Sequence, residues 1–234
     1  MVTQTQSKGL QVREGRIELT APYLDSERTF IYPPVRGIYT KCAEQLSEQG
    51  LYQPTFSEIV SLAHGAWQNS DEKYSKEIIK IMKDSWIRGF TGILYNKEGA
   101  YIQDKPQIVD GRVSMSENDL VRKLESKDSS VRFVPFGYKT GEQSSRALAK
   151  NPFVIALCGS EDAGKEQAEK LAEVADKYRT SPWLFSYDST NEPITRVSAL
   201  DSYWGGYGLD VYGGNHGDDR DDYAFGVSAP KALQ

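Results

Sequence analysis

The residues best suited to chemistry lie between positions 210 and 222, where acidic side chains surround one histidine. Carboxylate oxygens are the ligands that Ca²⁺ and Mg²⁺ prefer, and a bound cation would relieve the repulsion between them. One interpretation is therefore a Ca²⁺ or Mg²⁺ site formed by Asp210, Asp218, Asp219, Asp221 and His216. The metal would activate a water molecule, and a second carboxylate or His216 would accept its proton, which predicts a metal-dependent hydrolase.

The same stretch contains a nine-residue pattern typical of calcium-binding β-rolls. Residues 205–213, GGYGLDVYG, match every position of G-G-x-G-x-D-x-U-x. The next nine residues place Asp221 where the pattern requires a large apolar side chain, and a β-roll needs about three or more stacked copies. We therefore favour a solvated hairpin loop between strands at 208–212 and 223–227, with its carboxylates in water.

A second candidate site follows residues 153–158, an apolar segment that we interpret as a strand. Residues 159–166, GSEDAGKE, satisfy the first seven positions of the phosphate-binding pattern G-x-x-x-x-G-K-[ST]. The residues that would form a nucleotide or anion site are Gly159, Ser160, Gly164 and Lys165. Glu166 replaces the hydroxyl that should bind magnesium, and two more acids inside the loop would repel a phosphate. The pattern thus favours an ordinary helix start, with Ser160 as its cap.

The cysteines and tryptophans are scattered along the chain. Cys158 would lie between a strand and a helix N-terminus, where the helix dipole lowers a thiol pKa, although a small buried side chain is the simpler interpretation. The tryptophans are widely separated in sequence, so we interpret them as core or surface anchors and not as a stacking platform. They are Trp67, Trp86, Trp183 and Trp204.

Composition narrows the class of protein. The net charge is −5, with 28 basic and 33 acidic residues interspersed, so we expect no general binding to nucleic acid. No apolar run near the N-terminus is long enough for a signal peptide or a membrane span. The two cysteines cannot form a disulfide framework, which favours a reducing compartment. We expect a soluble, acidic, cytoplasmic protein.

The periodicity of apolar residues predicts a mixed α/β chain of the α+β class. Hairpins are expected at 10–19 and 90–104, and helices near 40–48, from Thr55, over 71–86 and from Ser116. Strand, helix and strand at 152–188 predict a βαβ unit, followed by an antiparallel hairpin. We divide the chain into a disordered N-terminus at 1–9, a lobe at 10–138, a boundary at 139–151 and a lobe at 152–229. The two lobes could also form a single domain.

These observations favour a non-enzymatic protein that binds a protein partner or associates with itself. A hydrolase that uses the aspartates and Ca²⁺ or Mg²⁺ is the first alternative. Nucleotide or anion binding at 159–165 is the second.

Overall fold

The computed structural model describes residues 11–13, 17–202, 208–218, 220 and 222–229. Residues 1–9, which the sequence predicts to be disordered, lie outside these ranges. In the part described, no helix is long and apolar enough to cross a membrane.

The strands are β1 (Gln11–Arg13), β2 (Glu18–Tyr23), β3 (Ser26–Arg36), β4 (Ile87–Tyr95), β5 (Gly99–Asp104), β6 (Gln107–Val109), β7 (Arg112–Ser114), β8 (Val131–Pro135), β9 (Gly141–Glu142), β10 (Trp183–Phe185), β11 (Ile194–Asp201), β12 (Asp210–Asn215) and β13 (Tyr223–Val227). The helices are α1 (Tyr39–Glu48), α2 (Phe56–Gln68), α3 (Lys73–Asp84), α4 (Glu117–Glu125), α5 (Ser145–Ala149), α6 (Pro152–Cys158) and α7 (Glu161–Ala175).

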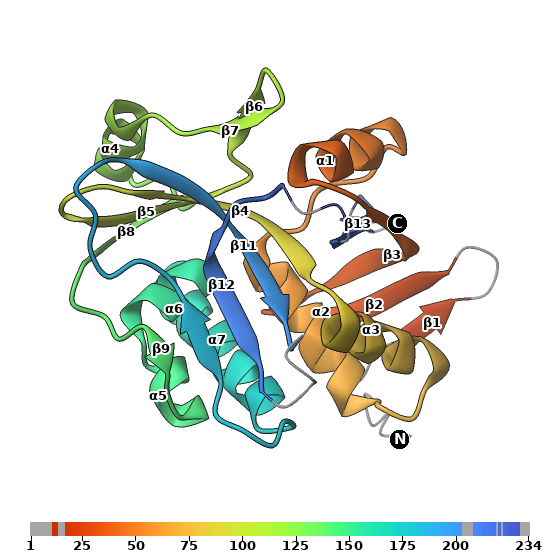
Figure 1. The fold of residues 1–234 in the computed structure, drawn as a ribbon. Coiled ribbons are helices and arrows are strands. Elements are labelled where there is room, and N and C mark those ends of the chain that lie inside the picture. The colour runs from red at the N-terminus through yellow and green to blue at the C-terminus, as the bar shows by residue number, and fades with distance from the viewer. Residues whose placement is uncertain (1–10, 14–16, 203–207, 219, 221, 230–234) are drawn as a thin grey trace.

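One mixed sheet organises the molecule (Figure 1). Its 11 strands follow the order β1-β2-β3-β13-β4-β11-β12-β10-β9, with β5 and β8 added beside β4. The α+β class is therefore confirmed, as are the hairpins β1–β2 and β4–β5. Both lobes assigned from sequence contribute strands to this sheet, and β9, inside the expected boundary, is its edge.

One face of the sheet is covered by helices. Alternate residues of the central strands point into this core, among them Ile93 of β4, Leu200 of β11 and Val211 of β12. Helices α2, α6 and α7 supply the facing side chains, including Ile59, Phe153 and Leu171. Helix α2 begins at the expected capping box of Thr55 and Glu58.

The opposite face is covered only in part. Helix α1 packs on Phe90 and Val197, and α4 packs on Leu94 through Leu120. Strand β4 lies under these helices on one side and under α2 on the other, which explains why all nine of its residues are buried. Strands β10 and β12 extend beyond this cover, and in Figure 1 β12 crosses in front of α7.

The predicted βαβ unit is wrong because its first strand is a helix. Residues 152–158 form α6, whose N-cap Asn151 accepts a hydrogen bond from the backbone N–H of Phe153. Asn followed by Pro is a typical helix start, and an apolar run of this length fits a buried helix as well as a strand. The α7 helix of the unit is present, but β10 pairs in parallel with β12.

The predicted C-terminal hairpin is also wrong. Strand β12 lies between β10 and β11, whereas β13 pairs with β3 and β4. Two strands of the sheet, β4 and β11, therefore separate β12 from β13. The polar stretch between them is a crossover between distant strands and not a hairpin turn.

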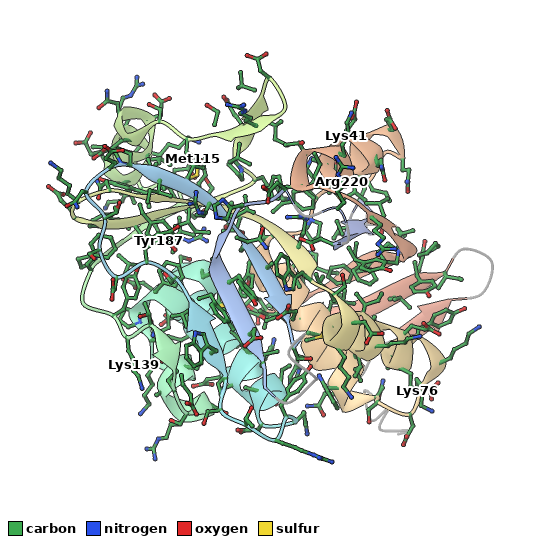
Figure 2. All side chains as sticks on the ribbon, in the orientation of Figure 1. Lys41, Lys76, Met115, Lys139, Tyr187 and Arg220 are labelled. Carbon is green, nitrogen blue, oxygen red and sulfur yellow. The ribbon has the colours of Figure 1, made fainter. Side chains whose placement is uncertain are left out.

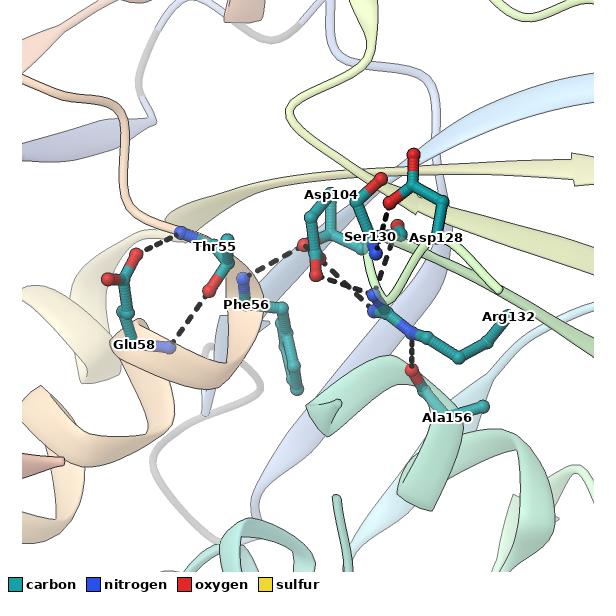
Figure 3. A network of polar contacts seen from close by, with 9 residues as sticks. Thr55, Phe56, Glu58, Asp104, Asp128, Ser130, Arg132 and Ala156 are labelled. Carbon is teal, nitrogen blue, oxygen red and sulfur yellow. Dashed lines mark hydrogen bonds and ion pairs between the residues drawn. The ribbon is translucent and has the colours of Figure 1, made fainter. Parts of the chain in front are cut away.

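A polar network ties the covered face together (Figure 3). The Arg132 guanidinium donates to both carboxylate oxygens of Asp104 and, through Nε, to the carbonyl of Ala156 at 2.9 Å. Asp104 also accepts a 2.8 Å hydrogen bond from the Thr91 hydroxyl, which in turn accepts from the backbone N–H of Phe56 at 3.0 Å. The network thus joins β5, β8, β4 and the first turns of α2 to the end of α6.

Replacing Asp104→Ala should lower the free energy of unfolding by about 2 to 4 kcal/mol, because it leaves the mostly buried Arg132 guanidinium without its carboxylate. Urea denaturation measures this change. The matched control is Asp119→Ala, which breaks an exposed pair with Arg122 and should cost less than about 1 kcal/mol. Equal effects of the two substitutions would contradict the role of the network.

Candidate functional site

The described aspartates of the predicted metal site do not meet. Asp210 begins β12, while His216 and Asp218 follow its last residue. A strand rises about 3.3 Å per residue, so the length of β12 places Asp210 about 20 Å from His216. In the ranges that the structure describes, no three side chains of His, Cys, Asp or Glu gather as a metal site would require. Asp219 and Asp221 lie outside the described residues.

Asp222 serves a structural purpose. Its carboxylate lies 2.6 Å from the Arg88 guanidinium, and both side chains are buried. Arg88 lies on β4, so this ion pair holds the chain just before β13 against the central strand. A buried carboxylate paired in this way is not available to a cation.

The loop that resembles a phosphate site connects two helices. The motif needs a strand before it, and α6 stands in that place. A Cβ atom at Gly164 would lie 2.4 Å from the carbonyl oxygen of Ile155, so this glycine permits close packing of α7 on α6. Lys165 pairs with Asp162 on the exposed first turn, at 3.3 Å. Ser160 is the N-cap residue but makes no side-chain cap bond. The φ of +145° at Gly159 and the close packing at Gly164 thus account for both glycines without a bound ligand.

The cysteines are buried and free of disulfide bonds. Cys158 ends α6, and burial raises the pKa of its thiol well above its ordinary value, although Arg132 nearby acts in the opposite direction. Burial also raises the pKa of Cys42 to about 11. The simpler interpretation of Cys158 as a small buried side chain is confirmed, and the alternative of a pKa lowered by a helix dipole is corrected, because the thiol lies in the core and not at a helix N-terminus.

The uncovered end of the sheet carries an acidic row. Strand pairing places Glu142, Trp183, Asp210 and Asp201 side by side across β9, β10, β12 and β11. Directly opposed residues point to the same face, so these side chains share the uncovered face. Trp183 is 42% exposed, whereas Asp201 is fully buried and Asp210 nearly so.

An aromatic row lies beside the acidic one. Phe185, Tyr212, Ala199 and Arg88 are opposed across β10, β12, β11 and β4. The rings of Phe185 and Tyr212 stack at 4.6 Å, and Trp183 lies 5.7 Å from Phe185. Because Ala199 is small, the Trp86 ring reaches over β11 to within 5.3 Å of Tyr212. The row Trp86–Tyr212–Phe185–Trp183 is thus continuous, and we call it the aromatic row.

Each end of the aromatic row opens into a hollow. At the Trp86 end, a groove of about 470 Å³ is lined by residues that include Tyr32, Pro34 and Tyr223. At the Trp183 end, a hollow of about 330 Å³ extends to Tyr187, a residue labelled in Figure 2. The uncovered face therefore combines one exposed and three half-buried rings with concave ends, which a flat solvated sheet would lack.

The charge around Tyr212, within the aromatic row, is negative. Burial raises the pKa of Tyr212, and the carboxylates of Asp201, Asp210 and Asp222 raise it further. Burial also raises the pKa of Asp210 to about 6, against the opposite effect of a hydrogen bond with Asp201. Two carboxyl groups share such a bond only when one of them holds a proton. Asp201 and Asp210 thus form a pair that keeps a proton toward neutral pH.

Sequence reasoning missed this surface. The interpretation of the tryptophans as core or surface anchors did not include their contacts, since strand pairing brings Trp86 to Tyr212 and Trp183 to Phe185. The available signal was alternation, with aromatic or acidic side chains at 183, 185, 210 and 212 and apolar ones at 184 and 211. That alternation predicts a half-buried strand but not which strands become neighbours.

Comparisons with known proteins bear on the fold. No protein-family model matches the chain, and no curated protein does. A solved structure, described as "Accommodation of massive sequence variation in Nanoarchaeota by the C-type lectin fold", superposes with a TM-score of 0.56. The fold is similar to the C-type lectin fold. The match covers 84% of this chain and 99% of the other, at 14% sequence identity. The likeness to this C-type lectin fold therefore concerns backbone architecture.

Replacing Asp210→Asn should raise the melting temperature at pH 7 by a few degrees and change it little at pH 4. The folded state binds the Asp210 proton up to about pH 6, above the ordinary pKa of 3.8, so wild-type stability is lost as pH rises through this window. The groups that face this carboxyl are Asp201, Tyr178 and Tyr212.

Thermal melting from pH 4 to pH 7.5 checks this expectation. Asp25→Asn, in the exposed turn between β2 and β3, is the control and should follow the wild-type curve. An Asp210→Asn variant that is less stable than wild type at pH 7 would show that the folded protein favours the charged carboxylate.

Proposed function

We propose that the chain is a non-enzymatic binding protein whose recognition surface is the uncovered end of the sheet, centred on the aromatic row. The observation that carries this proposal is the row of four neighbouring rings on the part of the face that α1 and α4 leave open, with α3 beside the groove at its Trp86 end. Trp183 is the most exposed tryptophan among those described, at 42%. Large aromatic side chains on a surface are the residues that contribute most to protein interfaces.

The surface has the rigidity, the shape and the mixture of apolar and polar groups that are typical of a binding site. Its strands are held from behind by core residues such as Leu184 and Val211, so the rings project from a rigid platform. The hollows at both ends of the row make the surface concave there. Carboxylates at its edge add polar contacts around an apolar centre, which is the usual anatomy of a protein interface. A protein partner therefore fits this surface.

The fold supports the same conclusion. The C-type lectin fold of the similar structure is described as accommodating massive sequence variation. A scaffold of that kind keeps its backbone while the exposed side chains change. We infer that here too the scaffold positions a recognition surface whose chemistry is set by local residues.

The two alternatives have less support. A metal-dependent hydrolase would need Asp210 close to His216 and Asp218, and the length of β12 separates them. A nucleotide site would need a strand before Gly159, and a helix stands there. Neither alternative uses the aromatic row.

A selection experiment tests the proposal. Random peptides displayed on phage are selected on the immobilised wild-type protein, and the enriched peptides are measured on a Trp183→Ala/Phe185→Ala variant. We expect at least a tenfold loss of affinity, because the two rings form the exposed end of the aromatic row. Melting curves of the variant confirm that it folds.

The control removes a different exposed ring. Tyr52 is 55% exposed and lies outside the aromatic row, so Tyr52→Ala should leave peptide affinity unchanged. Enriched peptides that bind the double variant as tightly as wild type, or that lose affinity for Tyr52→Ala instead, would place the binding surface elsewhere.

A further inference from the structure

We propose that the protein partner docks on the uncovered face through an arginine side chain, which stacks on Trp183 between Glu142 and Asp210. This inference rests on the proposed function, because it gives the chemistry of the partner for the same surface. The partner is a protein segment with exposed arginine.

The position of Trp183 supports this inference. Its ring is the most exposed part of the aromatic row, and both of its neighbours in strand register are acids. Neighbouring strands lie about 5 Å apart, so a cation above the ring would have the exposed Glu142 carboxylate on one side and, on the other, the nearly buried Asp210, which is hydrogen-bonded to Asp201. Glu142 is exposed on the edge strand β9 and free to move toward a ligand.

The electrostatics of the aromatic row agree with a cationic partner. The charged groups that act on the Tyr212 hydroxyl, within the described residues, are all carboxylates. Arg88, at the opposite end of this row of strands, is paired with Asp222, so these two charges offset each other and Asp201 and Asp210 supply the negative charge. Aromatic faces attract cations through their quadrupole, and the neighbouring carboxylates strengthen that attraction. An anionic partner would meet repulsion at the same place.

Arginine fits better than lysine. Its guanidinium is planar, so it can stack on the Trp183 ring while its N–H groups donate sideways to carboxylates. The structure already contains one such arrangement, because the Arg28 guanidinium lies over the Tyr23 ring at 4.5 Å and donates through Nε to the Glu58 carboxylate at 2.7 Å. A lysine ammonium is more strongly hydrated and offers no flat face to the ring.

The acidic row also makes the interaction sensitive to pH. The pKa of Asp210 is raised to about 6 by burial, so this carboxyl gains its charge as pH rises through that value. Among the described residues, the titratable groups that interact with it are Asp201 from β11, Tyr178 after α7 and Tyr212 from β12, and Glu142 on β9 lies on the far side of Trp183. Affinity for arginine should therefore increase from pH 5 to pH 7, and Asp210→Asn should abolish the part of the increase that this carboxyl causes.

The test uses a defined probe and the full chain. The probe is an acetylated, amidated peptide with three arginines separated by glycines, and its control carries citrulline, which keeps the planar shape without the charge. Binding is followed by NMR through backbone amide signals in wild type and every variant, and in wild type also through the indole signal of Trp183, identified by its loss in Trp183→Leu. We expect Glu142→Gln and Asp210→Asn each to weaken binding about two- to fivefold, and citrulline to weaken it more.

A charge-matched control separates local from general attraction. Glu169 is exposed on α7, on the far side of the sheet, so Glu169→Gln removes the same charge and should leave affinity unchanged. Equal weakening by Glu142→Gln and Glu169→Gln would overturn the inference, since it would show attraction to net charge alone.

The remaining outcomes distinguish the two proposals. If citrulline binds as well as arginine and Trp183→Leu abolishes both, the aromatic surface stands and the cationic partner is wrong. If Trp183→Leu binds the arginine peptide as tightly as wild type, this inference is overturned; the phage selection then decides the proposed function separately.

Discussion

The structure depends on the register of β12 between β10 and β11. Val211 lies opposite Leu184 and Leu200 in the core, while Tyr212 lies opposite Phe185 and Ala199 on the other face. A shift by one residue would exchange the two faces and expose Val211 while burying Tyr212 and its acidic neighbours. Gly213 reinforces this register, because a Cβ atom there would lie 2.4 Å from the Phe153 ring. Core packing on one face thus fixes what the other face presents.

The uncovered face contains groups that lower the stability of the fold, and the packing and polar pairs of the core offset that loss. Burial disfavours the charged form of Asp210, which is why the pKa of Asp210 rises, although its hydrogen bond with Asp201 acts in the opposite direction. The Arg132–Asp104 network and the Arg88–Asp222 pair satisfy the buried charges elsewhere in the sheet. Functional surfaces commonly contain side chains that lower the stability of the fold. The acidic row is such a group.

The sequence predicts local structure better than it predicts which strands become neighbours in the sheet. The capping box at Thr55, the early hairpins and the helix from Glu161 could be recognised because neighbouring residues determine them. Residues 152–158 were assigned wrongly because an apolar run fits a strand or a buried helix equally well. The aromatic row could not be found, since Trp86 and Tyr212 meet only through the strand order, which local patterns do not encode.

The most direct test of the account is the reactivity of single cysteines placed along β10 and β12. Cys42 and Cys158 are buried and can remain as unreactive background. Cysteine at Phe185 or Tyr212 should react with a thiol reagent at least about tenfold faster than cysteine at Leu184 or Val211, which requires the structure to open. The opposite order would show that the register is shifted, and slow reaction at all four positions would show that the face is covered.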